Sequence, residues 1–111
     1  SVNPIATKNS LSLLTENKRS LSLLKTDFFG DILFIEIGAT NVGSINQTFL
    51  PNKKYDKGEE KGYFSIGGSA IIILFERDRI HFDNDLIKAS EQGLEMKCLF
   101  GDGIGSSVSK E

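Results

Sequence analysis

Six consecutive apolar residues, Ala70 to Phe75, constrain the fold of this chain more than any other segment. The run has no polar alternation, so it predicts a strand that is covered on both faces and central in a sheet. It follows directly on Gly67-Gly68-Ser69. Because glycine adopts backbone conformations that other residues avoid, this corner predicts either an ordinary tight turn or a strained, accessible peptide bond before the serine.

The rest of the chain is rich in short strand-like segments, glycines and turn residues. The segments that predict strands are 10–14 and 20–24 (as a hairpin), 32–37, the region of Tyr63, and 94–100. Close backbone approach or a bend is expected over 38–45, and a loop over 46–61. Asp83 to Glu91 predicts one short helix that ends at Gly93. The expected fold is mostly β, a compact sandwich or barrel with one short helix.

Bulk composition narrows the class of protein. A length of 111 residues fits a single domain, 1–111. Thirteen basic and fifteen acidic residues give a net charge of -2 without a long block of either sign, so nucleic acid is not an expected partner. The longest apolar run falls far short of the roughly 20 residues that span a bilayer, so the fragment is expected to be soluble.

A single cysteine, Cys98, excludes an intramolecular disulfide and any cysteine-based metal cluster. Its place in an alternating segment predicts a small core residue. His81 is the only histidine, and it is expected to be a partly exposed strand residue rather than a general acid. Glu59 and Glu60 are adjacent, so they predict a solvated loop rather than an acid/base pair.

Three segments carry a recognisable combination of residues. They are Ser1-Val2-Asn3-Pro4 with Glu16-Asn17-Lys18-Arg19, Ile37-Gly38-Ala39-Thr40-Asn41-Val42-Gly43-Ser44-Ile45, and Lys57-Gly58-Glu59 through Leu74-Phe75-Glu76. In order and spacing they resemble the C-terminal part of phosphatidylserine decarboxylase, a pyruvoyl-dependent enzyme. The resemblance covers most of the chain and implies a C-terminal fragment of a longer proenzyme that spans a self-cleavage site.

The resemblance implies a role for each residue of the corner. Family members cut their own backbone just before the serine of a Gly-Ser that is usually followed by threonine, where this chain has Ala70. The cleavage site would be Gly68/Ser69, and Gly67 would support the corner. Ser69 would be the catalytic residue, as precursor of a covalent pyruvoyl group that forms a Schiff base with the substrate. No other cofactor and no metal is implied.

The implied reaction is the decarboxylation of phosphatidylserine to phosphatidylethanolamine. The full-length enzyme would be associated with the cytoplasmic face of a membrane, where its substrate lies. Family enzymes activate the serine with a His and an Asp in the upstream part of the proenzyme, and this chain begins after that region. The fragment alone is therefore expected to be unprocessed and inactive, with the upstream part as its partner and a homodimer as a further expectation.

A non-catalytic alternative stays open at this point. A small β-sandwich of the biotinyl-carrier or sugar-phosphotransfer type would use the Gly-rich corner only for packing. Such carriers need a modifiable lysine or a phosphorylatable histidine on an exposed hairpin. Neither Lys57 nor Lys61 is flanked by methionines, and His81 has no partner histidine. A retained Ser69 without a carbonyl in the full-length protein would favour this alternative.

Overall fold

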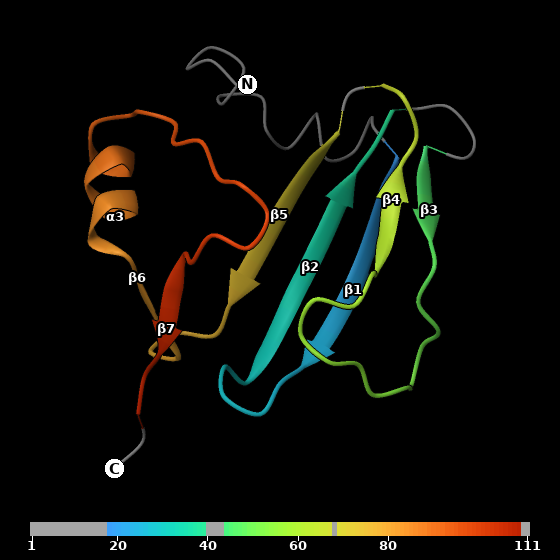
Figure 1. Cartoon of the computed structure of the whole chain (residues 1–111), viewed down its shortest axis with the longest axis horizontal. Helices are drawn as coiled ribbons and strands as arrows, with labels where there is room; N and C mark the ends of the chain where they lie inside the picture. The colour runs from blue at the N-terminus through green and yellow to red at the C-terminus, as the bar shows by residue number, and fades with distance from the viewer. Residues whose placement is uncertain (1–17, 40–43, 68, 110–111) are drawn as a thin grey trace. The chain divides into compact units, whose positions relative to one another are not determined.

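A computed structural model describes residues 18–39, 44–67 and 69–109 (Figure 1). In chain order the elements are β1 (Arg19–Lys25), β2 (Asp31–Ile37), β3 (Ile45–Gln47), β4 (Gly62–Phe64), β5 (Ala70–Phe75), β6 (Ile80–Phe82), α3 (Asn84–Glu91) and β7 (Gly105–Ser107). The strands form a three-stranded sheet in the order β1-β2-β5 and two pairs, β3-β4 and β6-β7. The prediction of a mostly β fold with one short helix is confirmed, and none of these described sheets closes into a barrel.

The described residues fall into two compact units, drawn from 1–22 and 34–73 and from 23–33 and 74–111. Strands β1, β2 and β5 each contribute residues to both units, and their arrows alternate in direction in Figure 1. The predicted strand 20–24 lies within β1, whereas its expected hairpin partner, 10–14, lies outside the described residues.

Strand β2 carries the buried apolar side chains of the described residues. Ile32 is 8% exposed and Ile35 is 9% exposed. The strand is rich in β-branched residues, which pack well on a pleated surface. In the first unit, β3 and β4 pair antiparallel with Ile45 opposite Phe64. The expected loop at 46–61 is thus shorter than predicted, because its first two residues belong to β3.

The second unit is held by a tight turn and an aromatic cluster. The backbone N–H and the hydroxyl of Thr26 both donate to the carbonyl of Gly30, whose φ of 69° suits glycine. Phe75 packs edge to face against Phe29 at 6.3 Å and against Phe82 at 5.5 Å between ring centroids.

The predicted helix is confirmed as α3, with Asp83 before it and Gly93 after it. Asp83 takes the N-cap position, although its side chain makes no capping hydrogen bond. Gly93 follows the C-cap with a φ of 69°, a conformation that glycine adopts without strain. Among the described residues, no helix has the length and apolar character needed to cross a membrane.

The structure contradicts the prediction that Ala70–Phe75 is a central strand covered on both faces. Among the described strands, in the order β1-β2-β5, it lies at the edge, and Ile71 and Leu74 are each 50% exposed. The central strand is β2. An apolar run shows that a strand favours burial, but it does not show which residues cover it.

The predicted last strand over 94–100 is also wrong. The Leu94 N–H donates to the carbonyl of Ala89 at the end of α3, and Leu99 and Asp102 close a turn through two hydrogen bonds of 2.8 and 2.9 Å. These backbone groups are therefore not available to a sheet. Cys98 lies in this segment and is exposed, so its predicted core position is wrong as well.

The strand that forms instead is β7, in the Gly-rich segment that follows. It pairs antiparallel with β6 and places Gly105 opposite Phe82. A Cβ at Gly105 would lie 2.5 Å from the carbonyl oxygen of His81, so only glycine permits this close approach of the two backbones.

Candidate functional site

The Gly-Gly-Ser corner joins the first unit's β4 to the edge strand β5. Gly67 has a φ of 145°, a conformation that residues with side chains rarely adopt. A Cβ at this position would also lie 3.3 Å from the Cβ of Ala39. Ser69 is exposed and directly precedes β5, whereas Gly68 lies outside the described residues. The corner therefore presents an accessible serine next to a backbone conformation that requires glycine.

A small-residue segment packs beside this corner. Gly38 is buried, and a Cβ there would lie 2.7 Å from the Oγ of Ser44. The same hydroxyl donates a 2.8 Å hydrogen bond to the carbonyl of Ala39. The Ser65 N–H donates to the carbonyl of Ser44 at 3.0 Å. The close backbone approach expected over 38–45 is confirmed at Gly38, and it ties this segment to the chain that enters the corner.

A buried ion pair in the first unit was missed by the sequence reasoning. The carboxylate of Glu36 lies in β2, where the residue is 5% exposed, and it accepts hydrogen bonds from Lys61 Nζ at 2.6 Å and Gln47 Nε2 at 2.7 Å. Lys61 Nζ also donates to Gln47 Oε1 at 2.9 Å. The signal that would have pointed to this network is a glutamate within the otherwise apolar run 32–37, since buried carboxylates need partners.

Three residues that the sequence analysis rejected as catalytic candidates are exposed in the structure: His81, Glu59 and Glu60. His81 is exposed and lies opposite Ser106 in the pairing of β6 with β7. Glu60 accepts a 2.9 Å hydrogen bond from the Thr48 hydroxyl, and Glu59 accepts one from the backbone of Asp56. Both glutamates are exposed loop residues, as predicted.

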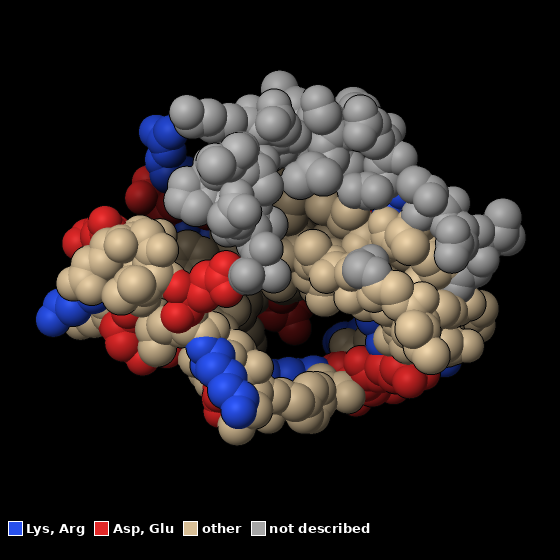
Figure 2. Space-filling view, turned by 90° about the horizontal axis from the view of Figure 1, so that it is seen from above, with Lys and Arg blue, Asp and Glu red and all other residues tan. Residues whose placement is uncertain are grey.

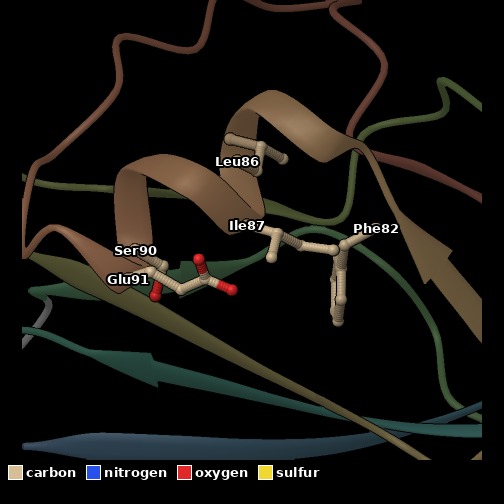
Figure 3. A pocket seen from close by; sticks show the side chains of 5 residues that line it. All are labelled: Phe82, Leu86, Ile87, Ser90 and Glu91. Atoms are coloured by element: carbon tan, nitrogen blue, oxygen red, sulfur yellow. The ribbon is translucent and has the colours of Figure 1, made fainter.

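An open hollow of about 340 Å³ lies against α3 in the second unit (Figure 3). It is lined by Phe82, Leu86, Ile87, Ser90 and Glu91. One carboxylate and one hydroxyl against apolar side chains offer no nucleophile activated by a base. Figure 2 shows acidic and basic side chains next to one another rather than in a block of one sign. Within 18–39, 44–67 and 69–109, no group of three His, Cys, Asp or Glu residues is placed to hold a metal ion.

Comparison with known proteins agrees with the resemblance. The family model for phosphatidylserine decarboxylase matches residues 1–106. Curated phosphatidylserine decarboxylase proenzymes from Chlamydia felis and Clostridium botulinum are 53% and 52% identical to the chain over 110 and 108 residues, or 99% and 97% of its length. The chain spans only 37% and 36% of the length of these two relatives. No solved structure matches it. The chain belongs to the phosphatidylserine decarboxylase family.

Proposed function

We propose that this chain is the self-cleaving part of a phosphatidylserine decarboxylase proenzyme, and that its backbone is cut between Gly68 and Ser69. The observation that carries the proposal is the corner itself. Gly67 holds a backbone conformation that favours glycine, and the exposed Ser69 follows two residues later at the start of β5. The word proenzyme in the names of the relatives also supports a processing step.

Cleavage would begin when the Oγ of Ser69 attacks the carbonyl carbon of Gly68. The peptide C–N bond breaks, and the Gly68 acyl group passes from nitrogen to oxygen as an ester. Loss of the Ser69 α-proton and of the bond from Cβ to the ester oxygen releases Gly68 as a carboxylate and leaves a dehydroalanine. Addition of water and release of ammonia convert this residue into a pyruvoyl group at the new N-terminus.

The surroundings of Ser69 fit this conversion. The residue is exposed, so water can reach it and ammonia can leave. A serine hydroxyl is a weak nucleophile at its ordinary pKa, so it needs a base close by. The family resemblance assigns that task to a His and an Asp in the upstream part of the proenzyme. The oxyanion that forms on Gly68 would in addition require aligned hydrogen-bond donors.

The pyruvoyl ketone would supply the electron sink that lets the amino-acid headgroup of phosphatidylserine lose carbon dioxide. The substrate places the full-length enzyme at a membrane surface, on the cytoplasmic side. The upstream part of the same proenzyme is the proposed partner, and a homodimer is a further proposal. The 111-residue chain alone is proposed to remain uncut and inactive because it contains the serine without its activating residues.

The test is to change Ser69→Ala in a full-length proenzyme that contains this chain. We expect the variant to stay uncut, to lack decarboxylase activity and to give no reaction with phenylhydrazine, which detects the pyruvoyl carbonyl. Ser107→Ala, at an exposed serine of β7, is the matched control and should be cut as the wild type is. A wild-type protein that keeps Ser69 and shows no carbonyl would favour a non-catalytic carrier domain instead.

A further inference from the structure

The buried carboxylate of Glu36 has a dense set of partners. It accepts charge-assisted hydrogen bonds from Lys61 and Gln47, both through Oε1. Both N–H groups of the Gln47 amide are used, because its Nε2 also donates to the Ser20 hydroxyl at 3.0 Å, and its Oε1 accepts from Lys61. The network therefore joins β1, β2 and β3 to the residue just before β4.

The ammonium of Lys61 is held from several sides. Its Nζ lies 4.6 Å from the centre of the Phe49 ring and 5.1 Å from that of Phe34, within the range of cation–π attraction. The side chain is 22% exposed, and that of Glu36 is 7% exposed. A pair this shielded from water has little freedom to find other partners. It therefore fixes the start of β4 against β2.

The two charged residues lie on the two segments that meet at the Gly-Gly-Ser corner. Glu36 stands two residues before Gly38 and three before Ala39, whose Cβ contacts the position of Gly67. Lys61 directly precedes β4, which leads through Ser65 into the corner. The ion pair joins these segments directly. Ser44 joins them a second time, because its carbonyl accepts from the Ser65 N–H and its hydroxyl donates to the carbonyl of Ala39.

We propose that Glu36 and Lys61 are positioning residues for self-cleavage at Gly68-Ser69. This inference rests on the proposed function. Attack of Ser69 on the neighbouring carbonyl depends on geometry, and displacements of about 1 Å far from the reacting atoms can slow a reaction about 100-fold. The ion pair sets where β4 lies against β2, and through β4 it sets where the corner presents the peptide bond.

The experiment measures the rate of self-cleavage in a full-length proenzyme, with newly made protein followed by gel electrophoresis. The variants are Glu36→Leu, Lys61→Met and the two together. Each single change leaves one charge buried without its partner, and we expect cleavage to slow by about 10-fold to 100-fold. The double variant also lacks the pair, and because each single change already removes the positioning contact, we expect it to be about as slow as the single variants.

Two controls keep the result specific. Lys25→Met breaks the exposed pair with Asp31, whose 3.5 Å contact lies at the surface, and it should leave cleavage unchanged. Thermal unfolding shows whether each variant is folded, and rates are compared for folded protein only. Glu36→Gln, which keeps the shape of the side chain, replaces Glu36→Leu if the latter does not fold.

The outcomes separate this inference from the proposed function. An uncut wild type, or cleavage of Ser69→Ala, would overturn the proposed function and the positioning role with it. If the wild type is cut, and the folded single variants are cut at the same rate, the positioning role alone is refuted. A double variant that slows cleavage by the product of the two single effects would also refute it, because the two residues would then act independently. A double variant that is cut at the wild-type rate would refute it too, because the single effects would then come from an unpaired buried charge.

Discussion

Gly67 offers the sharpest test of the corner, because its backbone and its surroundings both select glycine. The change is Gly67→Ala in a full-length proenzyme. A residue with a Cβ at a φ of 145° is strained by about 1–3 kcal/mol. Since about 1.4 kcal/mol corresponds to a factor of ten, the population that keeps the present corner geometry falls by about 5-fold to 150-fold. If cleavage requires this geometry, its rate falls by the same factor.

A second variant separates the backbone strain from the steric contact. The new Cβ would lie 3.3 Å from the Cβ of Ala39, a contact that is relieved by a shift of a few tenths of an ångström. Adding Ala39→Gly removes this contact and leaves the strain in place. We expect the double variant to be cleaved nearly as slowly as Gly67→Ala, because the backbone strain costs more free energy than the steric contact with Ala39.

The assay is the fraction of proenzyme cut over time. Gly93→Ala is the matched control, because Gly93 also has a positive φ, of 69°, and a Cβ added there would meet no atom within 4 Å. It carries a similar backbone strain away from the corner, so cleavage should proceed at the rate of the wild type. A Gly67→Ala proenzyme that is cut within about twofold of the wild-type rate would refute the reasoning, since strain of about 1 kcal/mol already implies a larger change.

Two further predictions follow from the packing and from the proposed division of the proenzyme. Gly38→Ala should destabilise the protein by about 1–3 kcal/mol, because its Cβ would lie 2.7 Å from the Oγ of Ser44. Urea unfolding measures this loss, and an unchanged midpoint would contradict the close approach. The 111-residue chain alone should keep its intact mass of 12.2 kDa during prolonged incubation. Mass spectrometry that finds it cut at Gly68-Ser69 would show that no upstream residue is needed.

Sequence patterns within short segments correctly predicted β2 and α3, which depend on neighbouring residues. Strand β2 follows from a run of β-branched and aromatic residues, and α3 follows from Asp83 at its start and Gly93 at its end. The glycine at position 67 also signalled an unusual backbone, because its φ of 145° is one that residues with side chains rarely adopt. In each case the residues that determine the structure are neighbours in the chain.

Features that depend on distant residues were not predictable in this way. Lys61 and Glu36 are 25 positions apart, and no periodicity links them. The same limit explains why β5 was expected to be central, because apolar side chains do not show which residues pack over them. Residues 94–100 have a strand-like alternation, yet the turn between Leu99 and Asp102 uses the backbone groups that a sheet would need.

Self-cleavage before Ser69 is tested most directly by the intact mass of a full-length proenzyme that contains this chain. We expect two pieces. The first ends in the carboxylate of Gly68, and the second begins at residue 69 and is lighter by one ammonia than a piece with a free N-terminal serine. A single uncut chain, or a second piece that retains the amine of Ser69, would contradict the claim that this serine becomes a pyruvoyl group.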